Sequence, residues 1–301
     1  MLANNNKMII NKLAKNSVKS NKKQCGILFF TIVLSAFMLF CVFTIGWTYL
    51  DSSRLQNTRL NGAEYDITTM NGFTSKQVKS LQSNKNIQNV GMESYAGFIK
   101  SSEFDNTVEI GLLWCDETFW NNLMSPARTK LDGHYPQNKN ELMVTKDILK
   151  TCGNENLSVG DSLILTYENN TGVYTDEFVI SGIWDGYGDT SAGFVSKAFY
   201  DETGYDLKNN GILCIKLNCN YVFPTTIQSI EKSLDFSDRQ IFAPTGYIEN
   251  SFKLLLGICG LALVICLSAY LLIYNILYLS VSGKIRYYGL LQSLGMTKKQ
   301  L

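Results

Sequence analysis

The sequence has very few of the residues and motifs that catalysis needs. It contains one histidine, His134, which stands in the turn-like sequence GHYP. A Ser-His-Asp triad or a histidine-based zinc site would have to use this residue, and nothing around it resembles such a motif. The sequence also has no glycine-rich loop ending in Lys-Ser/Thr, so we expect no nucleotide hydrolysis by this chain. These absences predict a protein that is not an enzyme and needs no cofactor or metal.

Acidic residues are missing from both ends of the chain. Residues 1–50 contain six lysines and no Asp or Glu, and residues 284–301 contain four basic residues and no acid. All 26 acidic residues therefore lie in residues 51–283, together with 17 basic residues, which gives that segment a net charge of about −9. The chain is basic at both ends and acidic in the middle.

Charge of either sign is absent from two long stretches. The 27 residues between Lys23 and Asp51 and the 30 residues between Lys253 and Lys284 contain no charged residue, and most are apolar. A membrane-spanning helix needs about 20 predominantly apolar residues, because its backbone groups must be satisfied within the helix. We therefore predict transmembrane helices at residues 25–50 and 254–282.

The first apolar run has an alternative interpretation as a secretory signal peptide, since basic residues precede it. A signal peptide has an apolar core of about 7–15 residues and a small-residue cleavage site. This run is longer, and Trp47 and Tyr49 stand at its outer edge as an interfacial belt would. We favour a retained span. By the positive-inside rule, both basic ends then lie in the cytoplasm and residues 51–250 lie outside the membrane.

Residues 51–250 combine strand and helix patterns. Six segments are predicted strands, several with alternating apolar and polar residues: 64–70, 107–113, 141–144, 161–168, 176–184 and 211–217. Five segments are predicted helices: 75–83, 117–124, 145–152, 195–204 and 225–234. Thr74 and Thr145 stand at N-cap positions. Helices interspersed with strands at this spacing predict an α+β domain with two lobes.

The eight cysteines leave two interpretations open. Four of them lie in or beside the apolar runs, where a thiol behaves as a small apolar group: Cys25, Cys41, Cys259 and Cys266. The other four lie in the predicted outer domain: Cys115, Cys152, Cys214 and Cys219. These four would permit two disulfides with three connectivities, or they could be free, buried thiols. Their spacing forms no tight framework, so we favour free thiols.

The lysine-rich start of the chain, residues 1–24, has apolar residues at near-helical spacing. These residues are Ile9, Ile10, Leu13, Ala14 and Val18. The pattern fits an amphipathic helix on the inner membrane face, where each lysine near anionic lipid contributes about 1 kcal/mol. The alternative is a disordered segment that only sets the topology. We favour the helix, with membrane lipid as its partner.

The chain ends with KIRYYGLLQSLGMTKKQL, residues 284–301. If this segment is helical, four apolar residues form one stripe: Ile285, Tyr288, Leu291 and Leu294. Gly295 then stands where a helix would end, and Thr297 with Gln300 fits a capping box for a further helix. The sequence stops one residue later, so we expect it to be a fragment of a longer protein.

This ending resembles the cytoplasmic signature of the FtsX/MacB-type permeases of ABC transporters, in which Arg, Gly-Leu-Leu, Leu-Gly and a Ser/Thr follow a transmembrane helix. The matching residues are Arg286, Gly289, Leu290, Leu291, Leu294, Gly295 and Thr297. Tyr287 stands where the family usually has Glu, so a polar contact of that Glu is not expected here. Three further segments resemble the family in the expected order: LDGHYPQNKNELMVT (131–145), NLSVGDSLIL (156–165) and EFVISGIW (177–184).

The resemblance implies the permease subunit of a bacterial ABC transporter in the plasma membrane, with residues 51–250 as a MacB-type periplasmic core-like domain. The family passes conformational change across the membrane from an ATPase on a separate chain, for export, extraction or mechanotransmission. Residues 283–301 would be the coupling segment at the start of an FtsX-like domain, with Lys298 beside the matching residues as a further contact. The implied partners are the cytoplasmic ATPase, membrane lipid and a second permease copy or half, and no nucleic acid.

A two-span sensor with an outer ligand-binding domain is the alternative from another functional class. In receptors of that layout, the second span continues into a long signalling helix with heptad repeats. Here Gly289 and Gly295 interrupt the segment after the second span, and no heptads are present. We therefore favour the permease.

Overall fold

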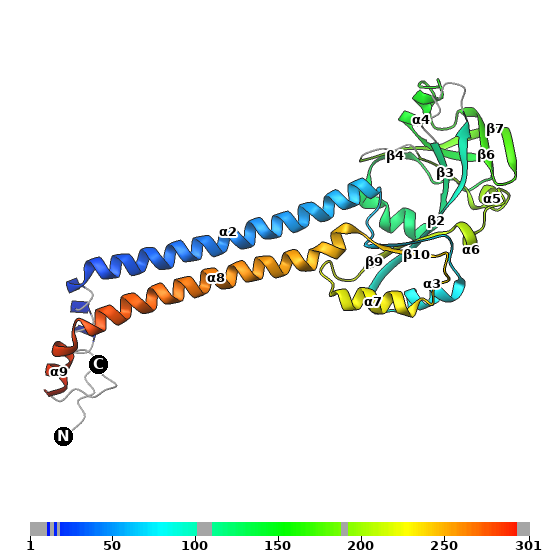
Figure 1. The fold of residues 1–301 in the computed structure, drawn as a ribbon. Helices are drawn as coiled ribbons and strands as arrows, with labels where there is room; N and C mark the ends of the chain where they lie inside the picture. The colour runs from blue at the N-terminus through cyan, green and yellow to red at the C-terminus, as the bar shows by residue number, and fades with distance from the viewer. Residues whose placement is uncertain (1–10, 13–14, 17–18, 101–109, 188–191, 294–301) are drawn as a thin grey trace. The chain divides into compact units, whose positions relative to one another are not determined.

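The structure is a computed structural model that describes residues 11–12, 15–16, 19–100, 110–187 and 192–293. The chain divides into two compact units. One unit comprises Met1–Tyr49 and Leu255–Leu301, and the other comprises Leu50–Leu254. Figure 1 labels the elements of both units.

Two long helices have the length and composition of membrane spans. Helix α2 runs over Lys22–Asn61 and α8 over Gly246–Ser282. Their large apolar side chains are exposed on all sides, as with Phe30 at 71% and Leu279 at 66%. A helix that is apolar all round needs an apolar environment, either a protein core or lipid. Because these side chains are not covered by the described protein, both helices are candidate membrane spans.

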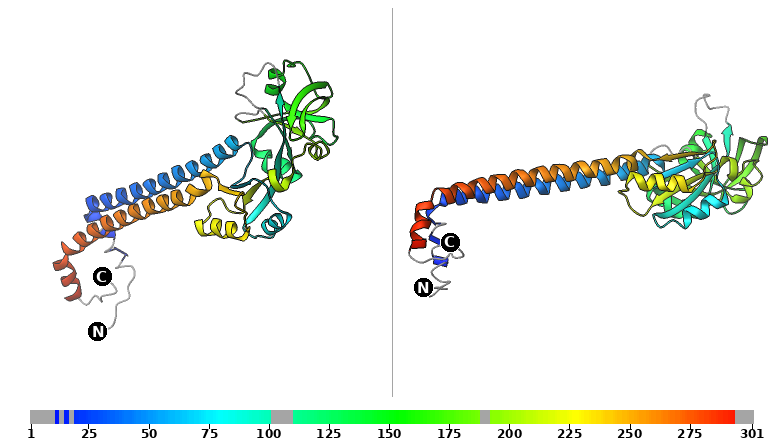
Figure 2. Two further views of the ribbon diagram at one scale, coloured as in Figure 1. Left: turned by 45° about the vertical axis from the view of Figure 1, so that its right-hand side comes forward. Right: turned by 60° about the horizontal axis from the view of Figure 1, so that its bottom comes forward.

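Within the first unit, α2 and α8 lie side by side in all the views of Figures 1 and 2. They pack tightly at Gly46, where an added Cβ atom would lie only 2.7 Å from Cδ1 of Ile258. Small residues let the backbones of membrane helices approach and gain van der Waals contact. Gly46 therefore leaves room for the Ile258 side chain between the two helices.

The second unit is built on one mixed sheet of ten strands in the described part of the chain. The strands are β1 (Ile67–Met70), β2 (Ile87–Lys100), β3 (Ile110–Cys115), β4 (Arg128–Gly133), β5 (Glu141–Thr145), β6 (Ser162–Asn169), β7 (Gly172–Gly186), β8 (Ala192–Val195), β9 (Ile212–Leu217) and β10 (Ile241–Pro244). Their order is β10-β1-β9-β2-β3-β8-β5-β7-β4, and β6 pairs with β2 and β7. The pairs β3–β8 and β5–β7 are parallel, whereas the other pairs are antiparallel.

Short helices lie between the strands. They are α3 (Ser75–Gln82), α4 (Lys146–Thr151), α5 (Lys197–Tyr200), α6 (Leu207–Asn210) and α7 (Pro224–Ser233). The predicted N-caps are correct: the Thr74 hydroxyl accepts from the amide of Gln77 in a full capping box, and Thr145 accepts from Ile148. The helix predicted at 117–124 is present, but most of it is not α-helical. Phe119–Leu123 form a π-helical turn, and the helix predicted at 195–204 is limited to α5.

Two hydrophobic clusters lie on the two halves of the long strand β2. One cluster joins β1 and β9 to α3 and α7 through Ile67, Leu81, Ile215 and Ile230. The other joins β3 and β5–β8 to α4 and α5, with Leu142 among its buried residues. The chain therefore has the α+β domain that the sequence predicts, placed in sequence between two long apolar helices.

All eight cysteines are free in the structure. The buried pair Cys115 and Cys214 stand on β3 and β9, which flank β2 on opposite sides. Two strand spacings separate them by about 9.5 Å, beyond the Cα separation of about 7 Å that a disulfide tolerates. The four thiols of the α+β domain are free in the structure, as favoured, although only Cys115 and Cys214 are buried, whereas Cys152 is half-buried and Cys219 is exposed.

Candidate functional site

The coupling segment predicted from the sequence begins with a break in the helix after the second span. Helix α8 ends at Ser282, and α9 spans Ile285–Ser293. Between them, Gly283 and Lys284 form a turn in which the amide of Lys284 donates to the carbonyl of Val281 over 3.0 Å. The segment after the second span is therefore a separate short helix.

Four of the eight predicted coupling residues lie on α9: Arg286, Gly289, Leu290 and Leu291. Arg286 and Gly289 are exposed, and Leu290 is 63% exposed. Leu294, Gly295, Thr297 and Lys298 lie outside the described residues. The same holds for most of the predicted amphipathic segment 1–24, of which residues 11–12, 15–16 and 19–20 are helical.

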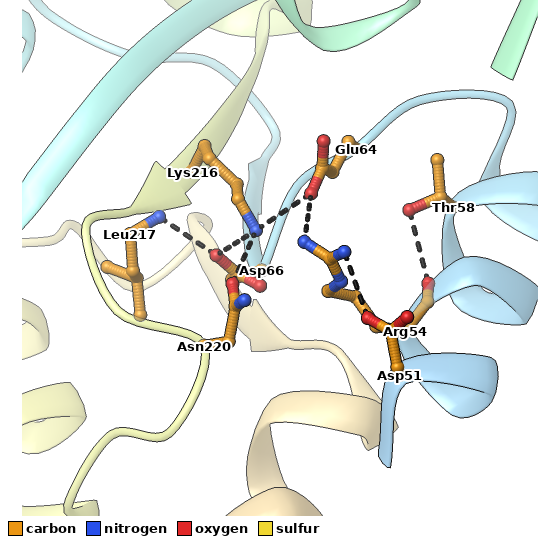
Figure 3. A network of polar contacts seen from close by, with 8 residues as sticks. All are labelled: Asp51, Arg54, Thr58, Glu64, Asp66, Lys216, Leu217 and Asn220. Atoms are coloured by element: carbon orange, nitrogen blue, oxygen red, sulfur yellow. Dashed lines mark hydrogen bonds and ion pairs between the residues drawn. The ribbon is translucent and has the colours of Figure 1, made fainter. Parts of the chain in front are cut away.

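A second candidate site, which the sequence did not indicate, is a network of charged side chains in the α+β domain (Figure 3). It begins on the last turns of α2 and continues after the chain reverses at Gly62. Gly62 has the left-handed φ of 68° that commonly ends a helix. The reversal brings Glu64 and Asp66, which precede β1, back beside Arg54 of α2 and Lys216 of β9.

The buried end of this network is the pair Lys216 and Asp66. The Lys216 side chain is 8% exposed and that of Asp66 is 2% exposed, and their Nζ and Oδ2 atoms lie 3.3 Å apart. The same Oδ2 accepts a hydrogen bond of 2.8 Å from the amide of Leu217. Burial raises the pKa of Asp66, while the charge of Lys216 and the Leu217 amide act in the opposite direction.

The outer end of the network reaches helix α2. Glu64 Oε1 lies 3.3 Å from Lys216 Nζ and 3.4 Å from Arg54 Nη1, so one carboxylate oxygen joins the strand to the helix. Arg54 Nη2 also contacts Asp51 Oδ1 over 3.1 Å. The side chains of Arg54 and Asp51 are 36% and 63% exposed. Solvent screens this end far more than the buried end.

The first turn of α8 is tied to the same acid. The amide of Thr245, just before α8, donates to the backbone carbonyl of Asp66 over 2.8 Å. The Thr245 hydroxyl in turn accepts from the amide of Ile248 at 3.5 Å. Tyr247 is buried beside these groups, and burial raises its pKa above the ordinary range. Asp66 thus connects β9 through its side chain and the start of α8 through its backbone.

The network is a set of ion pairs that joins the last turns of α2 to β9 through the residues before β1. In the described residues, no group of three or more His, Cys, Asp or Glu side chains could hold a metal ion. His134 is exposed, and its Nδ1 lies 3.0 Å from the carbonyl of Tyr135. The signal that could have revealed the network is Lys216 itself, a lysine inside the apolar strand ILCIKL, since a buried charge requires a partner.

Comparisons with known proteins give a distant likeness in fold. No protein-family model and no curated protein matches the chain. Among solved structures, the periplasmic region of MacB from Actinobacillus actinomycetemcomitans matches with 12% identity and a TM-score of 0.41, over 64% of this chain and 95% of that one. The extracellular domain of the noncanonic ABC-type transporter YknZ from Gram-positive bacteria matches with 11% identity and a TM-score of 0.35, over 55% and 87%. A domain of a permease protein from Porphyromonas gingivalis matches with 9% identity and a TM-score of 0.36, over 60% and 88%.

Proposed function

We propose that this chain is a permease subunit of the ABC-transporter type, which couples ATP hydrolysis on a separate cytoplasmic chain to movement of an extracytoplasmic domain. The motif from Arg286 to Thr297 and the upstream segments that resemble the FtsX/MacB-type permeases support this function. So do the basic ends and the two candidate spans around an acidic α+β domain. Residues 25–50 and 254–282 would lie in the plasma membrane, with both termini cytoplasmic and residues 51–250 outside.

The observation that carries the proposal is that both long helices are attached to the domain close to Asp66. The last turns of α2 reach this region through Arg54 and Glu64, and the start of α8 reaches it through Thr245. Both helices that lead away from the domain are therefore bonded to the same strand pair, β1 and β9. A shift of either helix would be transmitted to the sheet, because a packed core and a buried ion pair resist local deformation.

The proposed coupling segment at the cytoplasmic side would consist of α9 and the residues after it. Its exposed Ile285 and Leu290 can contact lipid or the ATPase, and Arg286 and Lys298 supply positive charge at the inner membrane face. The turn at Gly283–Lys284 separates α9 from α8, so α9 can change direction without bending the span. The same break disfavours the sensor alternative, which needs one continuous signalling helix.

Purification of the full-length protein from its native membrane tests the partner. We expect a nucleotide-binding subunit to co-purify and its ATPase activity to rise in the complex. Recovery of a histidine kinase in place of an ATPase would contradict the permease function and favour the sensor.

Substitutions in the coupling segment test its role. Leu291→Asp with Leu294→Asp, or Gly295→Val, should abolish stimulation of the ATPase while the thermal unfolding of the α+β domain stays unchanged. Gln292→Ala, a change on the exposed face of α9, is the matched control and should preserve stimulation. Full stimulation in all of these variants would show that the segment does not couple.

Cysteine labelling tests the topology. In a background without native cysteines, Glu177→Cys on β7 should react with a membrane-impermeant maleimide added to intact cells. Lys298→Cys should react only after the membrane is opened. Labelling of both positions from the same side would contradict two spans.

A further inference from the structure

The α+β domain contains a polar cavity of about 440 Å³ beside the start of α3. Three segments far apart in the sequence form its wall: residues 71–77, 208–209 and 234–240. They come from the part of the domain where Figure 1 shows α3, α6 and α7. The volume lies within the range of about 300–1,000 Å³ that is typical of small-molecule sites.

Hydrogen bonds between uncharged groups hold this wall in place. Gln77 Nε2 donates to the carbonyl of Leu234 over 3.0 Å and to Gln240 Oε1 over 3.0 Å. Gln240 Nε2 donates to the carbonyl of Gly72 over 2.7 Å. A Cβ atom on Gly72 would lie 1.9 Å from the carbonyl oxygen of Lys208, so the two segments touch through their backbones. The cavity is therefore preformed, and its charged side chains are not needed to build it.

The backbone of the wall is itself unusual. Asn71, with φ of 65°, and Asp235, with φ of 47°, are the two non-glycine residues with positive φ in the described ranges, and both line the cavity. Such conformations are unfavourable and persist only where neighbouring contacts fix them. At Asn71 the fixing contact is a hydrogen bond of 2.8 Å from Nδ2 to the carbonyl of Arg239.

Three cations line the cavity: Lys76, Lys208 and Arg239. None of them forms an ion pair with a described residue. Asp235 is the one acid in the lining, which leaves a net charge of +2. The nearby Asp206 accepts a hydrogen bond of 2.8 Å at each oxygen from Asn209, and the charge of Lys208 also helps to lower its pKa, so Asp206 offsets part of the positive charge beside the cavity. This positive site stands out in a segment, residues 51–283, that is otherwise strongly acidic.

We propose that this cavity binds a small anion that carries a phosphate monoester. Such a group has a charge of about −1.5 to −2 at pH 7, which matches the charge of the lining. Its oxygens can accept charge-assisted hydrogen bonds from Lys76, Lys208 and Arg239. Asn209 also lines the cavity, but its backbone amide and its Nδ2 atom already donate to Asp206. The volume also leaves room for a polar organic part of the ligand.

Calorimetric titration of the purified full chain in neutral detergent with glycerol phosphate, at constant ionic strength, tests the site. Saturable binding is expected, and it should weaken about tenfold in Lys208→Gln and in Arg239→Gln, because each loses a charged hydrogen-bond donor. Lys79→Gln removes the same charge from α3 outside the cavity and should leave the affinity unchanged. Glycerol should give no heat of binding.

Absence of saturable glycerol phosphate binding would overturn the proposal. Equal weakening by Lys79→Gln would also overturn it, because the response would then reflect only the charge of the domain. The variant side chains are exposed, so unchanged thermal unfolding is expected and confirms that each variant is folded.

A lipid headgroup and a soluble metabolite can present the same phosphate. Titration in neutral nanodiscs with and without phosphatidic acid separates these sources. Weaker binding of glycerol phosphate in the phosphatidic acid discs assigns the cavity to a lipid headgroup, and unchanged binding assigns it to a soluble ligand. This inference does not depend on the proposed permease function.

Discussion

Two acidic side chains contact the same face of strand β9, but their hydrogen-bond and ion-pair partners differ. Asp66 lies beside Lys216, and Glu93 of β2 lies two residues away along β9, where Cys214 donates a hydrogen bond of 3.7 Å to its Oε1 atom. Residues i and i+2 of a strand point to the same side, so Lys216 and Cys214 face one environment. Asp66 has a cation and a backbone amide as partners, whereas Glu93 has a thiol.

These surroundings give the two acids different roles: Asp66 holds two strands together through an ion pair, whereas Glu93 is a group that titrates. Asp66 is nearly inaccessible, yet Lys216 opposes the effect of burial on its pKa, so the ion pair links β1 to β9. For Glu93, burial raises the pKa to about 7, and the hydrogen bond from Cys214 offsets little of this. Its charge therefore changes close to neutral pH, beside Tyr65, whose pKa burial also raises.

Removal of the cation from the Asp66 site should have the largest effect. Lys216→Met leaves a buried carboxylate without its partner and should lower the free energy of unfolding by about 3–5 kcal/mol. Thermal or guanidinium unfolding in detergent, followed by the fluorescence of Trp114, Trp120 and Trp184 in the α+β domain, measures this change.

Lys130→Met is the matched control, because Lys130 stands on strand β4 with an exposed side chain. It should change stability by less than about 0.5 kcal/mol. The double variant Asp66→Asn with Lys216→Met should lose less than the sum of the single changes, because no unpaired charge remains. An equal loss in the two lysine variants would show that Lys216 is not a structural tie.

The sequence predicted the α+β class and most elements with strong alternation, but it missed the central strand β2. Its segment IQNVGMESYAGFIK contains two glycines, which normally indicate a turn. The structure explains Gly91 by packing, since an added Cβ would lie 2.7 Å from Leu123 Cδ1 of the π-helical turn. Such a tertiary contact has no local signal. The strands β4, β8 and β10 were also missed, although β1 and β5, which are as short, were predicted.

The two candidate sites also differ in how far the sequence alone could predict them. The residues on α9 belong to a contiguous motif, so the sequence alone could locate them. Asp66 and Lys216 are 150 positions apart, and only the pairing register of β1 with β9 brings them together. Lys216 within an apolar strand could have indicated a buried charge, but it could not have indicated the partner of that charge.

Glu93 should make the stability of the domain depend on pH over a neutral range. Its pKa is raised from 4.5 to about 7 in the folded state, so the folded protein holds a proton there that the unfolded chain has released. The resulting stability is fully present below about pH 4.5 and is lost as the pH rises through 7. The rise of this pKa from 4.5 to about 7 corresponds to roughly 3 kcal/mol.

Glu93→Gln tests this, because glutamine keeps the size and cannot ionise. Unfolding measured between pH 5 and pH 8 should show the wild-type protein losing stability relative to the variant as the pH rises. Glu117→Gln changes an exposed side chain nearby, and its stability should depend on pH in the same way as that of the wild-type protein. A constant difference between Glu93→Gln and wild type over this range would contradict the titration of Glu93.

The outer end of the Asp66 network should give the smallest change in stability and the clearest change in coupling. Arg54 contacts Glu64 at 3.4 Å and Asp51 at 3.1 Å, but solvent reaches all three side chains. Arg54→Gln should therefore cost only about 0.2–1 kcal/mol, and high salt should remove most of this effect because it screens exposed charges. Under the proposed function, if α2 drives the domain through this contact, stimulation of the partner ATPase should nevertheless fall in Arg54→Gln. Arg59→Gln, which removes a charge five residues further along α2 together with a stacking contact of 4.2 Å on the Tyr187 ring, leaves the Arg54–Glu64 contact intact and should not lower it. A decrease in stimulation that matches in both variants would mean that helix charge, and not the Arg54–Glu64 contact, carries the motion from α2 to β9.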